Sequence, residues 1–388
     1  MAKLSKTTKT VIIAAAVLLV LGAVLLVLVM TSPKDSGNSG DASAVSGEAG
    51  TSESSAAAED SSSASSGADE KIVINSCEQE DVLKLEVSNQ TGSFSFDRAS
   101  REVSSTDDDG NVSTATQYYW TSPELDGISR NDSTIGAFVR SMAGLSASSM
   151  VEEDASDLEK YGLAEPLSTV KVTFDDGTSN EICFGIRNPA ASNYVYCCVK
   201  GSSDVMEVSY YSTGSAFYDI KDFVSLVLTD AYDSNNPQEL EYLTIERKDL
   251  SEPVEIEYMF DVAAEAEDED SVVTTFNSHR ITSPITAELD TTSGQTICYG
   301  LYALSAASCQ YIDPTDEELA ATGLDDPYCR VSFKYGGKAR VLLLGNEIRE
   351  SSDDSDEGSL SSVTGYYAMF EGDRLIYAIS TSNAPWYT

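Results

Sequence analysis

Histidine is nearly absent from this chain of 388 residues, which contains only His279. Histidine is the side chain that most often serves as a general base or a metal ligand, so its scarcity argues against most catalytic and metal-binding arrangements. The Gly-x-Ser-x-Gly elbow, the P-loop and the His-Glu-x-x-His motif are missing as well. We therefore expect a protein that is not an enzyme, with no catalytic, cofactor-binding or metal-ligating residues.

Basic residues are also scarce, because 24 Lys and Arg stand against 64 Asp and Glu and leave a formal net charge of −40. Binding to a phosphate backbone needs a basic surface, so nucleic acid is excluded as a direct partner. The acidic runs 267–270 and 353–357 are expected to be solvated loops. Asp107 to Gly110 resembles part of an EF-hand loop, but the twelfth position is then Thr116, where a glutamate is required. We expect no dedicated calcium site.

Long hydrophobic runs are limited to one, the 20 residues from Val11 to Met30. At about 1.5 Å per residue, a helix of this length spans roughly 30 Å, the thickness of a hydrocarbon core. Lys3, Lys6 and Lys9 precede the run, so the positive-inside rule places residues 1–10 in the cytoplasm and the carboxy-terminal body outside. A cleaved secretory signal is the alternative, but its apolar region is usually only about 7 to 15 residues long. The sequence predicts a single-pass cell-membrane protein.

Residues 31–70 consist almost wholly of Ser, Ala, Gly and acidic side chains, and Val45 is the only sizeable aliphatic residue. Such a segment cannot bury enough apolar surface to offset its chain entropy. We expect a disordered linker. A flexible coil of about 40 residues has a root-mean-square span of roughly 35 Å, which would hold a folded body clear of the lipid.

The rest of the chain repeats itself at an offset of about 160 residues. The matching stretches are 120–123 with 281–284, 145–149 with 304–308, and 161–166 with 322–327. Residues 161–166 read Tyr-Gly-Leu-Ala-Glu-Pro, and residues 322–327 read Thr-Gly-Leu-Asp-Asp-Pro. We predict two tandem units, residues 72–235 and 236–388.

Each unit reads as an α+β fold of antiparallel hairpins with two helices. Alternating apolar residues predict opening strands at 82–87 and 243–247, and Asp109-Gly110 indicates a hairpin turn. Helical spacing predicts first helices over 133–145 and 294–304. A shorter second helix is expected to begin at Asp154 or Ser156 in one unit and at Asp313 in the other. Hairpins are predicted over 170–185 and 331–345, followed by one more strand pair in each unit.

The repeat also gives His279 and the cysteines a structural explanation. His279 occupies the position of Tyr118, so a strand position accounts for it without catalysis. Four of the seven cysteines stand where the other unit has apolar residues, namely Cys183, Cys197, Cys198 and Cys309. Neighbouring Cys197 and Cys198 point to opposite faces of a strand, which disfavours a bond between them. A single long-range disulfide stays open as an alternative.

The motif order of the first unit resembles the bacterial domain of unknown function 4340 family. Trp-x-x-Pro123 is followed by a helix ending in Leu-Ser-Ala147, then by Asp-Leu-Glu-Lys-Tyr-Gly-Leu-x-x-Pro166 and by Phe-Gly185. The resemblance extends over roughly residues 72–388 as two tandem copies. It implies a membrane-anchored extracytoplasmic protein, often encoded beside an ABC-2-type transporter with a gliding-motility-like subunit. No catalytic residues come with it.

The sequence and the resemblance together predict a non-enzymatic accessory or docking subunit of an ABC-type transporter or envelope complex. An exposed patch over 121–123 and 282–284, lined by aromatic residues, would favour docking. The alternative is a surface module that binds glycan or peptide, with Tyr118 to Trp120 and Trp386-Tyr387 as its aromatic surface. A hydrolase that uses two facing carboxylates is less favoured, because 64 acidic residues place some pairs close together in any fold.

Overall fold

The computed structural model describes residues 72–106, 112–233, 235, 238–259, 279–289, 291–350 and 362–388. Several predicted features lie outside these residues: the cytoplasmic tail, the transmembrane helix at 11–30, the linker at 31–70, the turn at Asp109-Gly110 and both acidic runs. Within the described residues, no helix is long and apolar enough to cross a membrane.

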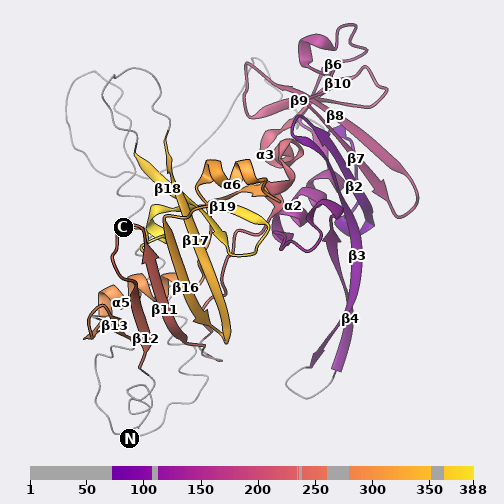
Figure 1. The fold of residues 1–388 in the computed structure, drawn as a ribbon. Helices are drawn as coiled ribbons and strands as arrows, with labels where there is room; N and C mark the ends of the chain where they lie inside the picture. Colours follow the sequence, from indigo (N-terminus) through magenta and orange to yellow (C-terminus); the bar gives the residue numbers. More distant parts are fainter. Residues whose placement is uncertain are drawn as a thin grey trace, which may run out of the picture. The chain divides into compact units, whose positions relative to one another are not determined.

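The first large sheet contains eight antiparallel strands in the order β4-β3-β2-β7-β8-β9-β10-β6 (Figure 1). Their bounds are β2 Val82–Asn89, β3 Gly92–Thr106, β4 Val112–Thr121, β6 Ser149–Glu152, β7 Ser168–Phe174, β8 Ser179–Arg187, β9 Tyr194–Val199 and β10 Val205–Ser209. Two short strands, β1 (Ile72–Val73) and β5 (Ser146–Ala147), form a separate pair.

The second sheet has nine strands in the order β14-β13-β12-β11-β16-β17-β18-β19-β15. Their bounds are β11 Leu240–Arg247, β12 Val254–Tyr258, β13 His279–Ser283, β14 Ala287–Glu288, β15 Ser308–Ile312, β16 Cys329–Tyr335, β17 Lys338–Arg349, β18 Val363–Phe370 and β19 Leu375–Ser380. Apart from β14, each strand has a counterpart at the same place in the first sheet. Both expected hairpins are present, as β7 with β8 and as β16 with β17.

The helices within the described residues are short: α2 (Asp132–Ala143), α3 (Tyr210–Thr213), α5 (Thr291–Ile297) and α6 (Asp316–Thr322). Single 3-10 turns occupy 79–81, 123–125, 159–161, 214–217, 220–223, 299–301 and 381–383.

The predicted α+β class was wrong for the described residues, which form mainly antiparallel β-sheet, while the transmembrane part of that prediction lies outside them. The prediction overvalued helical spacing in short segments. The helix expected from Asp154 or Ser156 is one 3-10 turn at 159–161, and the helix expected over 294–304 ends at Ile297. Asp313 does not cap α6, because its φ of 51° is left-handed and Thr315 forms the cap.

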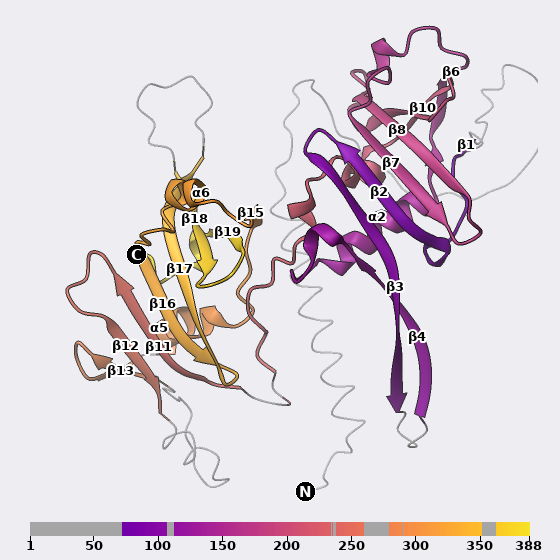
Figure 2. The same ribbon diagram turned by 45° about the vertical axis from the view of Figure 1, so that its right-hand side comes forward.

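The core of the first sheet lies between its inner face and α2. Helical spacing places Ile135, Phe138, Val139 and Met142 on the buried side of α2, and Figure 2 shows this helix lying across the sheet. Phe223 is fully buried and its ring centroid lies 4.9 Å from that of Phe96 and 5.9 Å from that of Phe138. α2 and Phe223 therefore cover one face of the first sheet, its inner face. The opposite face is the outer face.

A close backbone approach recurs in both sheets. Gly185 lies where β8 loses register with β9, and Gly345 lies where β17 loses register with β18. A Cβ atom on Gly185 would lie 2.0 Å from the Tyr161 carbonyl oxygen, and one on Gly345 would lie 2.2 Å from that of Thr322. The preceding turns end at Gly162 and Gly323, which have φ of 67° and 71°. The same local packing is therefore built twice.

Candidate interaction site on the outer face of the first sheet

Strand alternation creates a polar outer face on β2, β3 and β7. In β2, Leu85 and Val87 point into the core while Glu86 and Ser88 point outward. The neighbouring strands continue the pattern, with Ser93 and Ser95 outward from β3, and Thr169 and Lys171 outward from β7. We call this surface the outer face.

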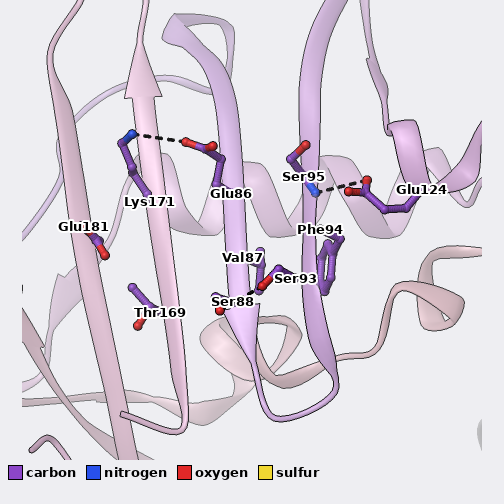
Figure 3. A pocket seen from close by; sticks show the side chains of 10 residues that line it. All are labelled: Glu86, Val87, Ser88, Ser93, Phe94, Ser95, Glu124, Thr169, Lys171 and Glu181. Atoms are coloured by element: carbon purple, nitrogen blue, oxygen red, sulfur yellow. Dashed lines mark hydrogen bonds and ion pairs between the residues drawn. The ribbon is translucent and has the colours of Figure 1, made fainter. Parts of the chain in front are cut away.

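An open concavity of about 400 Å³ lies on the outer face (Figure 3). It is lined by Glu86, Val87, Ser88, Ser93, Phe94, Ser95, Glu124, Thr169, Lys171 and Glu181. Pockets that enclose small ligands are mostly apolar and bury most of the ligand. This one is open and lined mainly by hydroxyl and charged groups, so it suits contact with a polar surface.

Each charged side chain that lines the concavity has an ionic or hydrogen-bond partner. Lys171 Nζ lies 3.3 Å from Glu86 Oε2, and Lys200 Nζ lies 2.6 Å from Glu181 Oε1. Glu124 Oε2 accepts hydrogen bonds from Ser122 Oγ at 2.8 Å and from the Ser95 amide at 3.4 Å. Exposed pairs of this kind contribute only about 0–1 kcal/mol each. They leave no concentrated charge of one sign that would select a small ion.

The outer face continues onto a ribbon formed by the distal parts of β3 and β4, residues 98–105 and 112–119. The ribbon extends beyond the other strands of its sheet (Figures 1 and 2). Most of its side chains are exposed, including Val103 at 41 % and Val112 at 67 %. Arg101 donates to Gln117 Oε1 at 2.9 Å and lies over the Tyr119 ring. A two-stranded ribbon without a covered face is only marginally stable in water.

On the same side of the sheet, the neighbouring surface over β8, β9 and β10 is covered by other side chains. Ala155, Tyr161 and Leu163 pack there on Cys183, Cys198 and Val205 as a small buried cluster, which we call the outer cluster. Tyr161 Oη donates to Glu152 Oε2 at 2.7 Å, and Lys160 Nζ donates to the same oxygen at 2.6 Å. The hydrogen bond from Lys160, followed by that from Tyr161, lowers the pKa of Glu152. These bonds hold the covering segment on the sheet.

His279 is the first residue of β13 and is 2 % exposed. Its Nε2 lies 3.0 Å from the Leu240 carbonyl oxygen, and its ring meets those of Tyr258 and Tyr299 edge to face. Burial lowers its pKa, against the opposing effect of the Leu240 hydrogen bond. The strand position agrees with the prediction, but the environment differs from that of Tyr118, whose side chain is 47 % exposed.

The other predicted sites are scattered. In the first Thr-Ser-Pro segment Ser122 is buried and only Pro123 is exposed, so it forms no continuous exposed patch. In the second, Thr282 and Ser283 are half-buried and Pro284 is exposed. Trp120 and Trp386 are both buried, and Trp386 Nε1 donates to the Ile297 carbonyl at 2.8 Å. Only Tyr118 and Tyr119 of the proposed aromatic surface reach the ribbon. Among the described residues no Asp or Glu is buried, so the buried carboxylate pair of the hydrolase alternative does not occur there.

All seven cysteines carry free thiols, and six of them are buried. Cys183 and Cys198 lie directly opposite each other on β8 and β9, a pairing that sequence reasoning missed. The signal was in the sequence, since aligning the hairpin 170–185 with the next strand would have brought the two positions together. The concavity was missed because no motif marks a polar strand face.

The family described as Domain of unknown function (DUF4340) matches residues 120–327. The match is single and runs from the Trp120 motif of the first unit to Pro327 of the second, so the predicted pair of tandem family copies is not confirmed. No curated protein matches the chain. No solved structure matches it either.

Proposed function

This chain belongs to the DUF4340 family, and we propose that it is a non-enzymatic docking subunit of a transporter or envelope complex on the outer side of the cell membrane. Its partner is a membrane-complex protein that binds the ribbon and the adjoining outer face. The observation that carries this proposal is the exposure of the ribbon on both of its faces.

The ribbon has the features of a surface that a partner completes. β4 lies at the edge of its sheet, so one side of the strand presents backbone N–H and C=O groups that no neighbouring strand of the sheet takes up. An extended segment of a partner can add to such an edge and form main-chain hydrogen bonds. Covering the ribbon would also bury Val103 and Val112, which removes apolar surface from water.

Local charge supports the same surface. The whole chain has 64 acidic and 24 basic residues, yet the paired strands, residues 98–105 and 112–121, contain Arg98, Arg101 and only one acid, Glu102; three further acids, Asp107 to Asp109, stand in the residues that connect them. A protein partner therefore meets less negative charge along the paired strands of the ribbon than over most of this acidic chain. The concavity beside it offers Ser and Thr hydroxyls for polar contacts at the rim.

The test uses the full chain in its native membrane. A photo-crosslinking residue at Val112 should capture a transporter or envelope protein, whereas the same residue at Tyr211, which is 85 % exposed outside the ribbon, should not. A shortened ribbon provides the matching deletion. Arg101 and Gln117 are direct cross-strand partners, so residues 102–116 can be replaced by an Asn-Gly turn without altering the register below.

We expect the shortened chain to fold with an unchanged melting temperature and to lose the co-purified partner. The docking role is wrong if the full chain brings down no transporter or envelope protein, or if the shortened chain brings down the same one in the same yield. Binding of a glycan or peptide by the shortened chain, without a protein partner, would favour the binding-module alternative.

A further inference from the structure

We infer that Cys183 and Cys198 are a dithiol that closes to an intrachain disulfide when the protein meets a small disulfide oxidant such as oxidised glutathione. The two residues are direct partners on β8 and β9. They belong to the outer cluster, and nothing in the docking role requires them. Formation of the disulfide is therefore independent of the docking role.

The strand register gives the pair a spacing suited to a disulfide. The Lys200 amide donates to the Glu181 carbonyl at 2.8 Å, which makes this neighbouring pair a hydrogen-bonded one. Pair types alternate along an antiparallel ladder, so Cys183 and Cys198, two residues farther on, are again a hydrogen-bonded pair with Cα atoms about 5.5 Å apart. Disulfides join Cα atoms about 4.4–6.8 Å apart, so the Cα spacing permits the bond. The Cβ atoms of a hydrogen-bonded pair lie about 5.5 Å apart, so the two strands must draw together locally to bring them to the roughly 3.8 Å of a disulfide. Cys197 points to the other face and is excluded from the bond.

The second sheet shows what this position holds when packing alone is required. There Leu343 and Met369 are direct partners at the equivalent place on β17 and β18. Leu343 belongs to a corresponding apolar cluster with Leu324 and Ile376, and Met369 packs against it. Two apolar side chains therefore fill the position in the second sheet, whereas the first sheet places two thiols there, which can pack in the same way and can also form a covalent bond.

The contact between the two thiols shifts their pKa values in opposite directions. The hydrogen bond with Cys198 lowers the pKa of Cys183, while burial opposes the shift and Thr169 and Lys200 assist it. The same contact, together with burial, raises the pKa of Cys198. Thr169 is the β7 partner of Cys183 and also lines the concavity.

The reaction is a thiol–disulfide exchange in two steps. The Cys183 thiolate attacks one sulfur of oxidised glutathione, the glutathione S–S bond breaks, and one glutathione thiolate leaves and takes up a proton. Cys198 then loses its proton to water and attacks the Cys183 sulfur, which releases the second glutathione. Two cysteine thiols are oxidised and one molecule of oxidised glutathione is reduced to two thiols.

The experiment treats the reduced full chain with oxidised glutathione, blocks the remaining thiols with N-ethylmaleimide and maps the unreduced tryptic peptides by mass spectrometry. Arg187 separates the two cysteines into different peptides, so a bond between them is seen as a linked pair. We expect Cys183 and Cys198 to be linked and the blocked thiols to fall from seven by two. Closing the loop between Cys183 and Cys198 should also raise the melting temperature by roughly 5–10 °C.

The second sheet supplies the matched controls. C183L/C198M installs the Leu343 and Met369 pair and should lose no thiols to a bridge. C197A installs alanine, the residue at the equivalent position 368 of the second sheet, and should keep the bridge. Because Cys197 and Cys198 lie in the same tryptic peptide, a bridge that survives in C197A identifies Cys198 as the partner of Cys183. The inference is overturned if Cys183 remains fully alkylated in the oxidised wild type and C197A, or if the bridge involves another cysteine.

Discussion

Replacing Gly185 by alanine tests the close approach on which the outer cluster is built. The new Cβ would lie 2.0 Å from the Tyr161 carbonyl oxygen and 3.1 Å from the carbonyl carbons of Tyr161 and Gly162. All three are backbone atoms, so no side chain can turn aside, and the chain must move by more than 1 Å to reach ordinary contact. Forcing atoms into a packed site costs roughly 1–3 kcal/mol.

The net effect is smaller than the clash alone. Alanine reduces the freedom of the unfolded chain and returns about 0.4–1 kcal/mol. Taking the clash at the upper end of its range, we expect Gly185→Ala to lower the free energy of unfolding by about 2 kcal/mol. Gly345→Ala should behave the same way, because its Cβ would lie 2.2 Å from the Thr322 carbonyl oxygen.

Gly136→Ala is the matched control, because the same methyl group is added in the interior of α2. There the Cβ would meet only the flexible end of Gln79, at 3.4 Å, and alanine favours a helix by roughly 0.5–1 kcal/mol. Urea unfolding can be followed by the fluorescence of the two buried tryptophans, Trp120 and Trp386. We expect the midpoint to fall by about 1 M for Gly185→Ala and to rise for Gly136→Ala. Equal shifts, or an unchanged midpoint for Gly185→Ala, would refute the packing argument.

Three further substitutions test separate features. Phe223→Ala removes a buried ring that contacts Phe94, Phe96 and Phe138, so unfolding should become easier by about 3–5 kcal/mol in a denaturant titration, against under about 0.5 kcal/mol for the exposed Tyr211→Ala. Thr315→Ala removes the capping box that Thr315 forms with Glu318 at the start of α6, so it should lower the free energy of unfolding by about 1 kcal/mol. Glu317→Ala, at an exposed position of the same helix, should leave that free energy nearly unchanged, and thermal melts distinguish the two variants. His279→Gln tests the buried imidazole: its pKa is lowered in the folded state, so the unfolded state binds the extra proton and wild-type stability falls as pH drops below about 6.5. The difference in unfolding free energy between the wild type and His279→Gln should therefore decline between pH 8 and pH 5, and a difference that does not change with pH would contradict the burial of a neutral ring.

Parts of the fold followed from local patterns. The strand patterns over 170–185 and 331–345 predicted both central hairpins, and the structure confirms them, with positive φ at the turn glycines Gly177, Gly336 and Gly337. Strands and turns of this kind depend on neighbouring residues, so the sequence contains their signal. The helices were less well predicted, because an apolar spacing of three or four residues over a short stretch also fits a 3-10 turn packed on a sheet.

The sequence by itself determined the scarcity of histidine and basic residues, the internal correspondence between residues near 120–185 and 281–345, and the alternation that gives each strand two faces. Only the tertiary structure decided which strands became neighbours and therefore which side chains met. It placed Cys183 against Cys198, left the ribbon of β3 and β4 exposed, and buried His279 while its counterpart Tyr118 faces solvent. The physical reason is that alternation fixes the face of a residue, whereas burial depends on what the rest of the chain packs onto that face.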